Sequence, residues 1–132
     1  MAYLNRKTFQ IIKYGDRRIE RLWAENFHVD DLIAPTIQIL NRRGYFTAGC
    51  CAGEHSIPAD GVWDYQHVFG TCWILFKEGV SLPSLPPGFH IEPYEILPSS
   101  VCIAKICDTQ HEKAMNQLYE WALNLPEFTG NI

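Results

Sequence analysis

Two adjacent thiols, a carboxylate and an imidazole lie within the turn from Tyr45 to His55, the part of the chain best equipped for chemistry. A thiolate is a strong nucleophile, and a nearby imidazolium or a set of exposed backbone N–H groups lowers the pKa of a thiol. Cys51 and His55, four residues apart, are therefore the candidate catalytic pair. The alternative is that Cys51 is a small core residue, a common role for cysteine.

A zinc site is the second chemistry to consider, because Cys50 or Cys51, His55, His67 and Cys72 are ligand types that zinc prefers. Adjacent cysteines in a strand point to opposite faces, and so do His67 and Cys72, five residues apart. The Cys-x3-His spacing also lacks a matching second half. We therefore predict no metal ligands and keep zinc as the less favoured alternative.

A pocket for a nucleotide-like or RNA ligand is the third possibility. Aromatic faces stack on bases, arginines approach phosphates, and the Gly49 to Gly53 backbone can offer N–H donors to an anion. In the competing interpretation Trp73 belongs to the core and the arginines only complement the helix dipole. The predicted ligand-binding residues are Arg42, Arg43, Tyr45, Thr47, Gly53, Glu54, His67 and Trp73.

Length and composition predict a single α+β domain spanning residues 1–132. The chain is 47% hydrophobic, which supports a packed core, and no apolar run approaches the ~20 residues of a membrane helix. The first residues lack the apolar block of a signal peptide, so we expect a cytoplasmic protein with no membrane partner. The five cysteines are an odd number and are expected to be reduced thiols.

Charge is unevenly distributed along the chain. The net charge of −4 argues against a generally basic nucleic-acid binder. However, residues 1–44 carry eight Lys and Arg against five Asp and Glu, whereas residues 45–132 carry three against ten. The first third can therefore present a local positive patch, although such charges are more often simply solvated.

Periodicity and turn residues place the elements around this site. Asp30 and Asp31 are candidate N-caps of a helix that Gly44 ends. Thr109-x-x-Glu112 fits a capping box for the last helix, and residues 23–28 are expected to form a loop. The last helix should bury Met115, Leu118, Ala122 and Leu125. Strands are expected at 8–13, 17–22, 45–50, 66–77, 89–93 and 101–106, and the first helix at 31–43. This order predicts two helices packed on one face of a mainly antiparallel sheet.

Residues 30–53 resemble the core segment of the tRNA wybutosine-synthesis methyltransferase family, the third enzyme of that pathway. In that family a helix ending in Asn leads to Tyr-Thr-Thr-Ser-Ser-Cys-Ser-Gly-Arg, which Thr47, Cys51 and Gly53 match. Glu54 stands where the family has Arg, and Gly49-Cys50 replaces its Ser-Ser. The resemblance implies a related α+β scaffold, RNA modification and S-adenosylmethionine as methyl donor. The Cys-Cys-x-Gly-x-His segment is also similar to small uncharacterised bacterial and phage proteins.

The sequence thus predicts a small cytoplasmic domain that binds a nucleotide-like or RNA ligand at the Tyr45 to His55 turn. In an enzymatic version it modifies RNA, with Cys51 and His55 near the reacting group. Two alternatives remain open. One is a non-catalytic, phage-type protein that sequesters a ligand or host partner. The other is a protein-interaction domain whose cysteines are structural.

Overall fold

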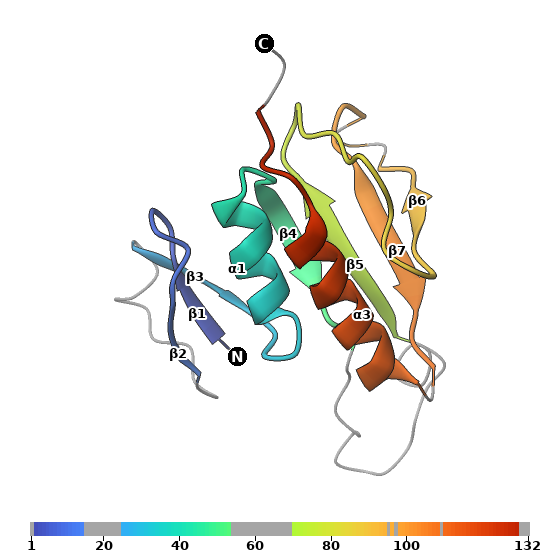
Figure 1. The fold of residues 1–132 in the computed structure, drawn as a ribbon, viewed down its shortest axis with the longest axis horizontal. Coiled ribbons are helices and arrows are strands. Elements are labelled where there is room, and N and C mark those ends of the chain that lie inside the picture. Colours follow the sequence, from blue (N-terminus) through green and yellow to red (C-terminus); the bar gives the residue numbers. More distant parts are fainter. Residues whose placement is uncertain are drawn as a thin grey trace.

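Two antiparallel sheets and two helices make up the α+β fold seen in a computed structural model (Figure 1). The structure describes residues 2–14, 25–53, 70–94, 96, 98–108 and 110–129. The three-stranded sheet has the order β2-β1-β3, with β1 at Ala2–Asn5, β2 at Ile11–Tyr14 and β3 at Asn26–Val29. The four-stranded sheet has the order β4-β5-β7-β6, formed by Thr47–Cys51, Thr71–Phe76, Cys102–Ile106 and His90–Glu92 respectively.

Helix α1, Ala34–Arg42, and helix α3, His111–Asn124, lie side by side over one face of the four-stranded sheet (Figure 1). This confirms the predicted α+β class. Helix α1 also contacts β1 and β2, so it joins the three-stranded sheet to the same core. The largest fully buried side chains include Ile33, Ile37, Leu40, Ile74, Phe76, Ile103 and Leu118. None of the helices in the described part of the chain combines the length and apolar character that a membrane crossing requires.

The last helix and the four-stranded sheet agree with the predictions made from their sequence patterns. All four residues of the expected stripe, Met115, Leu118, Ala122 and Leu125, are buried. Strands β4, β5, β6 and β7 fall within or beside the expected segments, and β6 is an edge strand. The N-cap of α3 is Gln110, without a side-chain hydrogen bond, and Thr109, where we predicted a capping box, lies outside the described residues.

The N-terminal third differs from its prediction. Strand β2 pairs with β1, a strand that we did not predict, and residues 15–24, which include the expected strand at 17–22, lie outside the described residues. Residues 26–28, expected in a loop, belong to β3, which lies on the other side of β1. The missed signal is Asn5, whose Oδ1 accepts hydrogen bonds from the N–H groups of Lys7 and Thr8, each at 2.9 Å, and so builds the β1–β2 turn.

Helix α1 begins later than predicted because its N-cap is Ile33, not Asp30 or Asp31. The Asp30 carbonyl accepts hydrogen bonds from the N–H groups of Ile33 and Ala34, which makes a turn before the helix. The Asp30 carboxylate instead accepts the Ala52 N–H at 2.9 Å, just beyond β4. The helix ends as expected, with Gly44 at φ +91°.

Candidate functional site

A pocket of about 570 Å³ lies between the two sheets, on the side of β4 that faces β3 and the β1–β2 turn. This volume is typical of small-molecule sites. Its wall combines segments distant in sequence: the β1–β2 turn, β3, the end of α1, β4, Trp73 of β5, and Lys77. The described lining residues are Arg6, Phe9, Phe27, His28, Val29, Asn41, Thr47, Ala48, Gly49, Cys50, Trp73 and Lys77.

Positive charge distinguishes this pocket. Arg6 and Lys77 line it, and its described lining includes no Asp or Glu, although the whole chain carries a net charge of −4. The Arg6 guanidinium lies 5.9 Å from the centre of the Phe27 ring, and Lys77 Nζ lies 6.0 Å from that of Phe46. These cation–π contacts hold both cations against rings. The pocket is therefore electrostatically suited to an anion.

Phe9 stands at the edge of the pocket in a strained conformation. Its φ is +59°, which costs of the order of 1–3 kcal/mol for a bulky residue. The turn holds it there, because the Phe9 N–H donates to the Asn5 carbonyl at 2.9 Å and the Phe9 ring packs 5.9 Å from Phe46. Strain of this kind is concentrated at binding sites, where surrounding structure maintains it.

Gly49 makes room for the ring of Trp73. A Cβ at position 49 would lie only 3.3 Å from Cζ3 and 3.4 Å from Cη2 of the indole. Because glycine places no side chain there, the indole can lie close to β4, and Trp73 also lines the pocket. An indole in a pocket wall can stack on a flat ligand ring.

Asn41 and Thr47 form a polar pair in the pocket wall. Asn41 is 4% exposed. Its Nδ2 donates to the Ile37 carbonyl at 2.8 Å and to Thr47 Oγ1 at 3.0 Å, and its Oδ1 accepts the Thr47 N–H at 3.1 Å. Helix α1 and the first residue of β4 are thereby joined through one side chain.

A second hollow, of about 620 Å³, lies between the start of α1 and α3. Its wall is largely apolar and contains Glu112 beside His111. The Nε2 atom of His111 is buried without a hydrogen-bond partner among the described residues. We do not assign an anion to this hollow, because a carboxylate lines it and its described lining includes no Lys or Arg.

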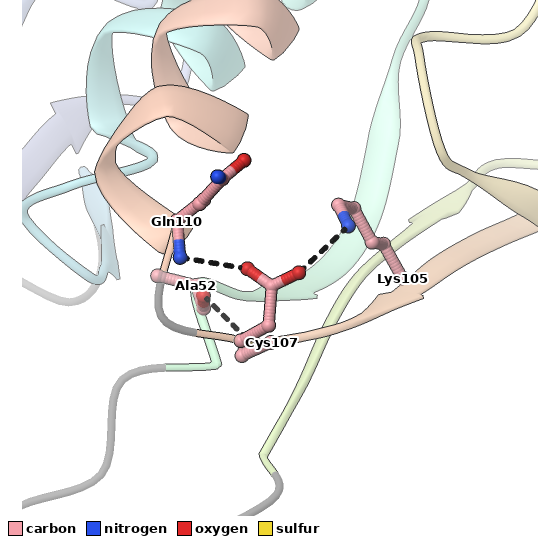
Figure 2. Close-up of polar contacts among 5 residues, drawn as sticks. Ala52, Lys105, Cys107 and Gln110 are labelled. Carbon is pink, nitrogen blue, oxygen red and sulfur yellow. Dashed lines mark hydrogen bonds and ion pairs between the residues drawn. The ribbon is translucent and has the colours of Figure 1, made fainter.

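The thiols gather at the far end of β4, where Cys51, Cys72 and Cys107 surround the chain at Gly53. The Gly53 N–H donates to Cys51 Sγ at 3.3 Å, and Cys107 Sγ donates to the Ala52 carbonyl at 3.8 Å (Figure 2). Gly53 has φ +79° and fits tightly, since a Cβ there would lie 2.3 Å from Cys107 Sγ. The thiols are thus packed against backbone rather than arranged around an open space.

Next to this thiol cluster, the Asp108 carboxylate ties the end of β7 to the start of α3. It accepts the Gln110 N–H at 2.9 Å and lies 4.0 Å from Lys105 Nζ (Figure 2). These two contacts explain why the Asp108 carboxylate lies where it does.

Burial keeps these thiols protonated. It raises the pKa of Cys50 to about 12, with the Asp30 carboxylate acting in the same direction. Burial likewise raises the pKa of Cys51, although the Gly53 N–H partly opposes this, and burial raises the pKa of Cys72 and Cys107. A thiol with a raised pKa supplies little thiolate at neutral pH, so the environment of Cys51 does not favour a nucleophile.

Raised thiol pKa values predict a loss of stability in alkali. Above the ordinary thiol pKa of 9.0 the unfolded chain releases protons that the folded chain retains. The free energy of unfolding should therefore fall between about pH 9 and about pH 12, with Cys50 alone contributing up to about 1.4 kcal/mol per pH unit. Urea unfolding at pH 8, 9 and 10 measures this. Cys50→Ala should make the free energy of unfolding fall less steeply with pH than in the wild-type protein. Equal slopes in the two proteins would contradict the prediction.

Tyr45, Arg42 and Arg43 do not join Cys51 in one site, which corrects our expectation. Tyr45 is 1% exposed, its hydroxyl donates to the Pro126 carbonyl at 2.8 Å, and its ring lies 5.3 Å from that of Phe128. The Arg43 side chain donates to the Leu125 carbonyl. Arg42 Nε donates to the Thr8 carbonyl at 3.2 Å.

These contacts bind the segment 125–128 over the α1–β4 connection. The Phe128 N–H also donates to the Arg43 carbonyl at 2.7 Å.

Phe128→Ala should lower the free energy of unfolding by about 2–4 kcal/mol, because it removes a partly buried ring and its stacking on Tyr45. Urea denaturation checks this, with Glu127→Ala as an exposed neighbour expected to change stability by less than about 0.5 kcal/mol. If Phe128→Ala and Glu127→Ala changed the free energy of unfolding equally, Phe128 would not be the residue that holds this segment in place.

Of the other predicted site residues, Thr47 and Trp73 line the pocket, whereas Cys51 and Gly53 belong to the thiol cluster. Glu54, His55 and His67 lie outside the described residues. No group of three His, Cys, Asp or Glu within the described ranges can hold a metal ion. Because His55 and His67 were among the zinc candidates, the zinc alternative stays a prediction.

Sequence reasoning missed Arg6, Phe9, Asn41 and Lys77. The basic bias of the first third pointed toward Arg6, but its position beside β4 depends on how the two sheets pack. The position of Asn41 just before the helix end could have pointed to it, because an amide that is buried there requires partners for its polar atoms.

The fold and the pocket define an α+β protein with a cationic, aromatic-lined site between two sheets. Comparison of the chain with family models, with curated proteins and with solved structures finds no match. The resemblance to the wybutosine-synthesis methyltransferase family therefore stays a prediction.

Proposed function

We propose that this protein binds a small anionic ligand with a flat ring, of the nucleotide type, in the pocket between the sheets. The observation that carries the proposal is the pairing of Arg6 and Lys77 on a pocket whose described lining has no carboxylate. A phosphate is the anion that such cations bind well in a partly buried site. Trp73, in the pocket wall, supplies a surface on which a base can stack.

Size favours a mononucleotide over a long RNA strand. The volume of about 570 Å³ fits one nucleotide. The strongly negative chain beyond residue 44 would repel an extended polyanion outside the pocket. We thus propose a single nucleotide-like ligand, whether free or at the end of a strand.

The proposed activity is binding without turnover. Methyl transfer to RNA from S-adenosylmethionine follows only from the resemblance, and the raised pKa of Cys51 leaves that residue little thiolate for catalysis. Sequestration of a nucleotide agrees with the non-catalytic alternative. A cytoplasmic location stays an expectation from the sequence.

Thermal unfolding of the full chain tests the proposal. The ligands are nucleoside monophosphates, the matching nucleosides, S-adenosylmethionine and bulk tRNA, each in a separate sample. A ligand at 100 times its Kd stabilises the folded state by about 2.7 kcal/mol. We expect monophosphates to raise the Tm and nucleosides to raise it much less. Equal shifts with and without phosphate, or no shift with any of these ligands, would overturn the proposal.

A further inference from the structure

Strand β6 forms the border of the four-stranded sheet that lies farthest from β4 (Figure 1). One side of β6 pairs with β7, and no strand in the described part of the chain pairs with its other side. All three of its residues, His90, Ile91 and Glu92, are exposed. A border of this kind presents backbone N–H and C=O groups to which another strand can add.

Ile91 carries the apolar face of the sheet out to this border. It stands opposite Ile103 of β7, so the two side chains share a face, and Ile103 is fully buried in the core. Ile91 itself is 61% exposed, and two further exposed apolar side chains, Tyr94 and Ile96, follow it in the chain. Exposed apolar surface beside an open strand is typical of a protein interface.

We propose that β6 pairs antiparallel with β6 of a second copy of this chain, about a two-fold axis at Ile91. The order of the three residues is complementary to itself in this arrangement. Ile91 lies opposite Ile91 of the second copy, and His90 lies opposite Glu92 of the second copy. The two polar groups suit each other, because His90 Nε2 contacts Glu92 Oε1 within a single chain.

Proline restricts this pairing to one register. Pro93 directly follows β6 and has no backbone N–H, so a shift that draws it into the pairing loses a hydrogen bond. Only three residues of each copy pair, and the dimer is therefore weak and depends on protein concentration. The sheet then continues through both copies, with Ile91 of each on the face that the helices cover.

Sedimentation equilibrium of the full chain without a nucleotide tests the pairing, at pH 6, where imidazoles are largely protonated. Between about 10 μM and about 500 μM protein, the mass of the wild type should rise from that of one chain, 15.2 kDa, toward twice that value. The mass of one chain at every concentration overturns the proposal. Because no ligand is present, the result does not depend on the proposed nucleotide site.

Two matched substitutions locate the interface. Ile91→Lys places two lysines opposite each other and should raise the Kd of the dimer by about tenfold or more. Ile106→Lys adds the same charge at an isoleucine that is 60% exposed but lies on β7, where it pairs with Thr71. This control should change the Kd by less than about twofold, because salt screens a distant charge. Equal losses in both variants overturn the proposal.

Charge reversal tests the direction of the pairing. His90→Glu places a carboxylate opposite Glu92 of the second copy and should weaken the dimer by about tenfold. His90→Glu combined with Glu92→Lys restores opposite charges across the two-fold axis and should return the Kd to within about threefold of the wild type. If the double variant dimerises as poorly as His90→Glu alone, antiparallel pairing about Ile91 is wrong.

Discussion

Replacing Arg6 and Lys77 together by methionine is expected to weaken binding of a nucleoside monophosphate by about 100-fold or more. Hydrogen bonds to charged groups contribute about 1.5–3 kcal/mol each, and tenfold in Kd corresponds to about 1.4 kcal/mol. Methionine retains an aliphatic chain that can remain on the rings of Phe27 and Phe46. Isothermal titration at low and physiological salt measures the loss.

A matched control removes the same charge elsewhere. Lys7 and Lys113 are exposed and lie outside the described pocket lining, so Lys7→Met combined with Lys113→Met gives the same net charge. This control should reduce affinity by no more than about threefold, through long-range attraction that salt screens. Similar losses in both double variants would show that net charge, and not the pocket, attracts the anion.

Gly53→Ala is expected to lower the free energy of unfolding by about 3 kcal/mol or more. The residue has φ +79°, and its added Cβ would lie 2.3 Å from Cys107 Sγ and 2.8 Å from the Cys72 backbone nitrogen. Backbone strain of about 1–2 kcal/mol is thus joined by overpacking of about 1–3 kcal/mol. Urea denaturation at neutral pH gives the difference directly.

Gly79→Ala separates the two contributions, because Gly79 has φ +87° but no atom within 4 Å of an added Cβ. Its free energy of unfolding should fall only by the cost of the backbone strain, about 1–2 kcal/mol. Cys107→Ala combined with Gly53→Ala should recover part of the loss, since the sulfur is removed while the Cys72 nitrogen stays. If Gly53→Ala costs no more than Gly79→Ala, the thiol cluster is looser than described.

Elements with long apolar periodicity were predictable from the sequence. The α3 stripe ending at Leu125 needs only local spacing, whereas the three-residue edge strand β6 was predicted from the prolines around it. Strands β1 and β3, of four residues each, have too few side chains to show a period. Their pairing depends on the turn that Asn5 builds and on burial against α1.

The site was predictable only where it lies on one segment. Thr47 and Trp73 belong to neighbouring strands, and their types alone suggested hydrogen bonding and stacking. Of the two cations in the same pocket, Arg6 comes from the distant β1–β2 turn, and Lys77 directly follows β5. Conversely, Tyr45 and Arg43 seemed available in the sequence, but residues 125–128, about 80 positions away, occupy them. Such long-range pairings depend on tertiary packing.

Strand β4 forms one border of its sheet, and an open border can template pairing with a second molecule. Here the Thr47 N–H is occupied by Asn41, and the Ala52 N–H just beyond the strand is occupied by Asp30. An incoming chain therefore meets donors that are already satisfied at both ends of the strand. Two polar side chains thus reduce the number of open donors along this border of the sheet.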